Sequence, residues 1–89
     1  MPYTIGFSAS AEREFKSLDR SLQRRIGSRV EALATNPYPP GARKLQAGPD
    51  LFRIRVGDYR VIYRVDGKQV TVLIVKIGHR REVYRQPDG

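Results

Sequence analysis

Residues 52–65 read FRIRVGDYRVIYRV, two runs of alternating apolar and polar residues joined by a Gly-Asp dipeptide. Successive side chains of a strand point to opposite faces of its sheet. Each run therefore predicts a strand with one apolar face and one face that carries arginines. Gly57-Asp58 suits a two-residue turn, so the segment predicts an antiparallel hairpin.

A turn at Gly57-Asp58 also fixes which residues of the hairpin face each other. Arg55 then opposes Arg60, and Arg53 opposes Ile62. Directly opposed residues point the same way, so we expect Arg53, Arg55 and Arg60 on one patch. Opposed like charges destabilise a sheet, which favours an anionic ligand at this patch. The alternative is a solvated basic face that only aids solubility, and the pattern leaves it open.

The sequence around the hairpin predicts a single domain that spans residues 1–89. Residues 3–7 alternate as a first strand, and Ser8 and Asp19 are suited to cap two following helices. Asn36-Pro37 ends the second helix, because the residue before a proline is disfavoured in helical conformation. Residues 36–50 form a connection rich in Pro and Gly.

The last strand of the predicted sheet follows a second two-residue turn at Asp66-Gly67. It covers the apolar run 70–75, lies inside the sheet and ends at Gly78. The expected fold class is therefore α+β: an N-terminal strand, a two-helix hairpin and a three-stranded antiparallel meander. We expect the helices to cover one face of the sheet and to leave the arginine-bearing face open.

The composition points to an anionic partner. The 89 residues carry a formal charge of +8, and the cations are thirteen arginines and four lysines. Arginine presents a bidentate fork that suits phosphate, so nucleic acid is favoured over a membrane or an acidic protein. The chain has no cysteine, no signal-peptide pattern and no apolar run long enough to span a bilayer. We expect a cytoplasmic protein without a membrane partner.

A second motif, KIGHRREVYR, spans residues 76–85. Its lone histidine, His79, is either structural or an acid–base group, and Tyr84 either packs, stacks on a base or titrates beside the guanidinium groups. The sequence lacks a Gly-rich phosphate loop, an HExxH motif, a Ser-His-Asp pattern and any acidic cluster. We therefore expect no metal and no other cofactor.

Together, RIRVGDYRVIY (residues 53–63) and IGHRREVY (residues 77–84) resemble the RelE branch of the RelE/ParE toxin superfamily. The two-helix N-terminal half and Lys44-Leu45 agree with it, so the resemblance covers nearly the whole chain. It implies the RelE-like fold and the toxin of a type II toxin–antitoxin module. Such a toxin is a metal-independent endoribonuclease, an mRNA interferase that cleaves mRNA in the ribosomal A site through attack by the ribose 2′-hydroxyl. The implied partner is a cognate antitoxin, RelB-like or other, and operator DNA is bound only through the antitoxin complex.

The resemblance also implies which side chains act. Arg60 and Arg80 would bind the phosphate oxygens, with Tyr84 near the 2′-hydroxyl or stacked on a base. The full implied set is catalytic Arg53, Arg55, Arg60, Arg80 and Tyr84, with His79 as a further acid–base candidate and with Arg64, Arg81 and Lys44 as RNA-binding residues.

The chain departs from the family at Arg53 and Arg55, where relatives often carry lysine. An arginine cannot lose its proton in a protein, so a neutral lysine base is closed to this chain. Proton transfer then falls to Tyr84, to His79, or to the RNA and the ribosome. Two other functions stay open: a ParE-like inhibitor of DNA gyrase without ribonuclease activity, and a catalytically idle RNA- or ribosome-binding module.

Overall fold

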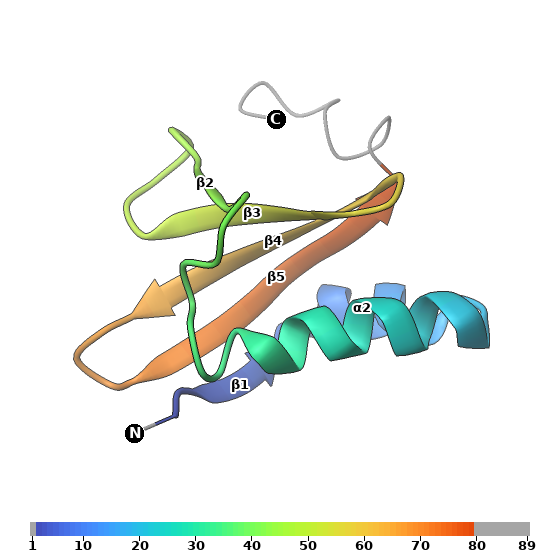
Figure 1. Ribbon diagram of the computed structural model, residues 1–89, viewed down its shortest axis with the longest axis horizontal. Helices are drawn as coiled ribbons and strands as arrows, with labels where there is room; N and C mark the ends of the chain where they lie inside the picture. Colours follow the sequence, from blue (N-terminus) through green and yellow to red (C-terminus); the bar gives the residue numbers. More distant parts are fainter. Residues whose placement is uncertain (1, 80–89) are drawn as a thin grey trace.

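The computed structural model describes residues 2–79, in which two helices cover one face of a five-stranded sheet (Figure 1). The sheet order is β1-β5-β4-β3-β2; β1 runs parallel to β5 and the other pairs are antiparallel. Neither helix of this part of the chain is long and apolar enough to cross a membrane. In chain order the elements are β1 (Thr4–Phe7), α1 (Ala9–Lys16), α2 (Arg20–Ala32), β2 (Arg43–Lys44), β3 (Leu51–Val56), β4 (Tyr59–Asp66) and β5 (Thr71–His79).

The predicted α+β class and its order of strand, two helices and meander are confirmed. The short edge strand β2 and the parallel pairing of β1 with β5 are additions that the sequence did not reveal. The two predicted helix caps are also confirmed. Ser8 Oγ accepts a hydrogen bond from the amide of Ala11 at 3.1 Å, and Asp19 Oδ1 accepts one from the amide of Leu22 at 2.9 Å. Helix α2 ends at Ala32, ahead of the predicted stop.

The core lies between the helices and the sheet. Its buried side chains come from α1, the α2 segment and the three long strands: Ala11, Ile26, Val30, Leu33, Ile54, Val56, Val61, Tyr63, Val65, Val72, Ile74 and Ile77. Tyr63 is fully buried, and its hydroxyl donates to the carbonyl of Pro37 at 2.7 Å. Burial, and after it the neighbouring Tyr38, raises the pKa of Tyr63 to about 12. The hydrogen bond ties β4 to the connection after α2.

The two hairpin turns differ. The β3–β4 turn is the predicted two-residue turn, with Gly57 at a φ of 61°. The prediction for the β4–β5 turn is wrong, because Asp66 pairs with Thr71 and residues 67–70 form a longer loop. Asp66 Oδ1 accepts from the amides of Lys68 and Gln69, both at 3.0 Å. This side-chain bonding stabilises the wider turn.

Strand β5 also runs further than predicted. Gly78 does not end it; it lies buried within the strand, opposite Arg60. A glycine inside a strand often marks a close approach of another group.

A β-bulge interrupts the pairing of β4 with β5. Tyr63 pairs with Ile74 and the adjacent Ile62 pairs with Lys76, so Val75 is the extra residue. Because of it, the core-facing positions of β5 shift from even to odd numbers between Ile74 and Ile77.

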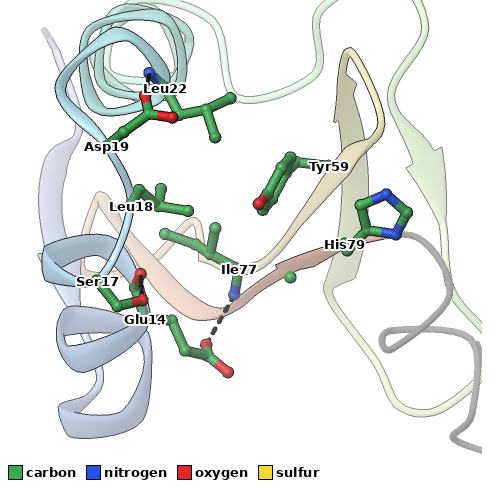
Figure 2. A pocket seen from close by; sticks show the side chains of 9 residues that line it. Glu14, Ser17, Leu18, Asp19, Leu22, Tyr59, Ile77 and His79 are labelled. Atoms are coloured by element: carbon green, nitrogen blue, oxygen red, sulfur yellow. Dashed lines mark hydrogen bonds between the residues drawn. The ribbon is translucent and has the colours of Figure 1, made fainter.

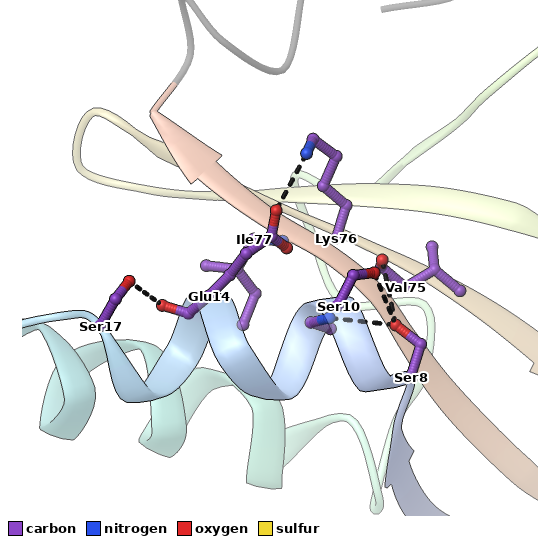
Figure 3. A network of polar contacts seen from close by, with 8 residues as sticks. Ser8, Ser10, Glu14, Ser17, Val75, Lys76 and Ile77 are labelled. Carbon is purple, nitrogen blue, oxygen red and sulfur yellow. Dashed lines mark hydrogen bonds and ion pairs between the residues drawn. The ribbon is translucent and has the colours of Figure 1, made fainter.

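Beyond Ile74, strand β5 has no β1 partner, and α1 covers this stretch. Glu14 accepts the amide of Ile77 on Oε1 at 2.9 Å and pairs with Lys76 Nζ through Oε2 at 3.0 Å (Figure 3). One carboxylate thus satisfies an edge amide and holds a lysine at the same time.

Candidate nucleic-acid interface

Four arginines of β3 and β4 lie on the sheet face opposite the core, here called the arginine face. Arg55 opposes Arg60 and Arg53 opposes Ile62, so the predicted register is confirmed. Arg64 lies two positions beyond Ile62 and shares this face. The hairpin therefore brings Arg53, Arg55, Arg60 and Arg64 together on one side of the sheet.

This face is less open than expected. Arg55 and Arg64 are exposed, but Arg53 and Arg60 retain only 4% and 5% of their accessible surface. Arg60 Nη1 donates to the carbonyls of Gly57 at 3.4 Å and Tyr59 at 3.2 Å. These bonds hold one end of the guanidinium beside the hairpin turn. The prediction of an open arginine face is therefore wrong for these two side chains.

Strand β2 extends the arginine face by one residue that the sequence pattern did not reveal. Arg43 opposes Arg53, so it points the same way. A pocket of about 200 Å³ lies here, lined by Arg29, Gly41, Arg43, Arg53 and Arg55. Two residues are too few to show an alternation, and Arg29 belongs to a helix, so neither Arg29 nor Arg43 carried a signal for this site.

Lys44, one of the predicted RNA-binding residues, is not brought to the arginine face. It opposes Phe52, whose side chain stacks on Tyr63 at a ring-centroid distance of 5.9 Å on the core side. The register therefore assigns Lys44 to the other face of the sheet.

His79 also lies apart from the arginines. It pairs with Tyr59, and the two rings meet edge-on with centroids 5.7 Å apart. Tyr59 precedes Arg60 in the strand and so points to the opposite face. Both rings line a pocket of about 490 Å³ beside the α1–α2 junction (Figure 2), together with Glu14, Ser17, Leu18, Asp19, Leu22, Ile77 and Gly78. The structure thus does not unite His79 with Arg53, Arg55 and Arg60.

The remaining predicted site residues, Arg80, Arg81 and Tyr84, lie outside the described residues, as does the short extended tail predicted at Val83-Tyr84-Arg85. The described geometry amounts to a guanidinium-rich surface that can bind and neutralise phosphate through charge-assisted, bidentate hydrogen bonds.

The chain has clear relatives. A family model described as the ParE toxin of the type II toxin–antitoxin system parDE matches residues 5–84. Toxin RelG of Mycobacterium tuberculosis is 32% identical over 87 residues, which are 97% of this chain and 100% of RelG. The mRNA interferase toxin RelE of Escherichia coli K12 is 27% identical over 90 residues, 97% of this chain and 94% of that toxin.

The fold has the same relatives. The archaeal RelE–RelB complex from Pyrococcus horikoshii contains a chain that superposes with a TM-score of 0.79 at 32% identity, covering 90% of this chain and 97% of that one. The chain therefore belongs to the RelE/ParE superfamily of type II toxin–antitoxin toxins, with RelE-like toxins among its relatives.

Proposed function

We propose that this protein is the toxin of a type II toxin–antitoxin module and acts as a ribosome-dependent mRNA interferase in the cytoplasm. The observation that carries the proposal is the convergence of Arg53, Arg55 and Arg60 through the register of the β3–β4 hairpin. These are the positions that the resemblance to RelE-like toxins assigns to the reacting phosphate. The relatives named mRNA interferases in Escherichia coli K12 and Shigella flexneri support the same activity.

The proposed reaction needs no metal. The ribose 2′-oxygen forms a bond to the adjacent phosphorus, the bond from phosphorus to the 5′-oxygen breaks, and a 2′,3′-cyclic phosphate and a 5′-hydroxyl result. One proton leaves the 2′-hydroxyl and one reaches the 5′-oxygen. Negative charge gathers on the phosphate oxygens in the transition state, and preorganised guanidinium groups stabilise it there.

The arginines bind the phosphate but do not move the protons, because arginine stays charged. His79 lies with Tyr59 on the other face of the sheet, so the proposal gives it no part at the phosphate. Tyr84, the RNA and the ribosome stay the candidates for proton transfer.

The proposed partner is a cognate antitoxin of the RelB kind, which covers the arginine face. Solved complexes of RelE with RelB from Pyrococcus horikoshii and Escherichia coli support this pairing. A positive surface favours a partner segment that carries acidic residues.

A second function is favoured by one observation, the description of the matching family model as a ParE toxin. On that alternative the protein inhibits DNA gyrase and leaves RNA intact. A third outcome, a ribosome-binding module without activity, would follow if Arg53 and Arg55 cannot support the reaction.

Brief expression of the protein followed by mapping of mRNA 5′ ends separates these functions. The proposal expects codon-phased cuts that disappear in Arg80→Ala and Tyr84→Phe and persist in Arg13→Ala, a control at an exposed arginine of α1. Intact mRNA with trapped gyrase–DNA complexes would replace the proposal with the second function. Growth arrest with neither signature would favour the third.

A further inference from the structure

Two arginine-lined pockets meet at Arg29 of α2. The first is the 200 Å³ pocket of the arginine face. The second has a volume of about 410 Å³ and lies where α2 approaches the β3–β4 turn; its lining is Arg24, Arg25, Ser28, Arg29, Val56 and Gly57. Arg29 lines both pockets, and the adjacent β3 residues Arg55 and Val56 line one each. The two pockets, here together called the path, are therefore neighbours that share Arg29 between the arginine face and α2.

The path is strongly positive. Six arginines line it, and no acidic residue among those described does. Within residues 2–79, ion pairs join Lys16 to Glu12 and Lys76 to Glu14, and neither pair involves Arg29, Arg43 or Arg55. Arg29, Arg43 and Arg55 carry like charges at neighbouring positions of the path, and like charges repel one another. An anionic ligand that spans both pockets relieves this repulsion.

Two glycines lie in the walls of the path. Each pocket has one glycine with positive φ in its wall, Gly41 at 92° and Gly57 at 61°. No atom lies within 4 Å of where a Gly41 side chain would begin, whereas a Cβ on Gly57 would lie 3.2 Å from Arg25 Nη2. Glycines of this kind let a ligand or a side chain approach the backbone closely.

We propose that this path binds consecutive phosphates of the substrate RNA beside the phosphate that reacts, with Arg29 and Arg43 as positioning residues. The inference rests on the proposed function, which supplies RNA as the substrate. In this proposal the RNA strand starts at Arg53, Arg55 and Arg60, crosses the sheet edge at β2 and β3, and ends at α2. Contacts to phosphate carry no base information, so the path holds the strand in register without selecting its sequence.

The test uses the full chain and a fluorescent single-stranded 2′-O-methyl RNA, which lacks the attacking hydroxyl. Binding is followed by anisotropy over a series of salt concentrations. For single strands, each phosphate that the protein neutralises steepens the fall of log K with log salt by about 0.7. Arg29→Gln and Arg43→Gln should each make this slope shallower by about 0.7, the contribution of one phosphate, and the double variant should lose the contribution of two phosphates.

Arg13→Gln is the matched control, since it removes an exposed arginine that lines neither pocket, and it should keep the wild-type slope. Unchanged slopes in both path variants, or no binding by the wild type, would overturn the inference. Retained RNA binding with impaired binding to a RelB-like antitoxin would also overturn it, by marking the path as a protein-binding surface.

The cleavage assay separates this inference from the proposed function. Kinetics on programmed ribosomes should give a raised KM and a nearly unchanged kcat for Arg29→Gln, as a positioning role requires. If the path variants have altered salt slopes but neither the wild type nor any variant cleaves mRNA, the proposed function is rejected and the phosphate path stands. Normal cleavage kinetics and normal slopes would reject the path alone.

Discussion

Arg53 illustrates how much depends on the choice between arginine and lysine at one position. It is buried and lines a pocket with Arg29, Arg43 and Arg55. A lysine there would have its pKa lowered both by burial and by the neighbouring positive charges. Arginine keeps its charge in the same surroundings, which fits a group that binds phosphate and does not transfer protons.

Arg53→Lys should therefore add a pH dependence to cleavage. The neutral lysine accumulates as pH rises, so the rate of the variant relative to wild type should increase with pH. Arg64→Lys is the matched control, because Arg64 is exposed on the same face and its replacement should give a flat ratio. Single-turnover cleavage on programmed ribosomes measures both ratios. A flat ratio for Arg53→Lys would show that the lysine acts there only as a cation.

Tyr63 offers a stability test at a single hydroxyl. Tyr63→Phe leaves the carbonyl of Pro37 without its 2.7 Å hydrogen bond, which should lower the free energy of unfolding by roughly 1–3 kcal/mol. The pKa of Tyr63 is raised from its ordinary value near 10 to about 12 in the folded protein, so the unfolded chain loses this proton at a lower pH than the folded one. The free energy of unfolding should therefore fall as pH rises above about 10. Urea unfolding from pH 9 to 12 should show this decline in the wild type and a shallower one in the variant.

At the scale of elements, the C-terminal half of β5 depends on a helix in place of a neighbouring strand. Unpaired strand edges invite pairing with other chains, and the Glu14 carboxylate covers this edge at Ile77 (Figure 3). The same carboxylate holds Lys76, so the lysine is anchored to α1.

Glu14→Ala should destabilise the protein by roughly 1.5–3 kcal/mol, the range for a hydrogen bond to a charged group. Glu12→Ala breaks the exposed Glu12–Lys16 pair on the same helix and should cost less than about 0.5 kcal/mol. Denaturant unfolding of both variants gives the comparison. Equal effects would mean that the bond from Glu14 to the strand edge contributes no more than a surface ion pair.

At the scale of the whole molecule, the sequence predicts features that depend on local periodicity. The hairpin register through Gly57-Asp58 and the caps at Ser8 and Asp19 are of this kind. Features set by distant parts of the chain were not predictable in this way. Three examples are the pairing of Arg43 with Arg53, the position of Arg29 in the same pocket, and the hydrogen bond between Glu14 and the amide of Ile77.

Periodicity also fails where a single residue changes the pattern. The Asp66 side chain widens a turn that its Asp-Gly dipeptide predicts to be tight. Gly78 suggests the end of a strand but lies within one, opposite a buried arginine. The overall charge of +8 predicts an anionic partner, but it could not show that two arginines of the arginine face are buried.

The bulge at Val75 adds one residue to β5 without reversing which side chains face the core. Val72 and Ile74 before it and Ile77 after it all reach the core, although their numbering changes parity. A version of this strand one residue shorter, without Val75, would present the same inward and outward sets. With or without Val75, the same residues of β5 face the core and the same residues face away from it. This position can therefore accept the loss or gain of one residue without a change in the two faces of the sheet.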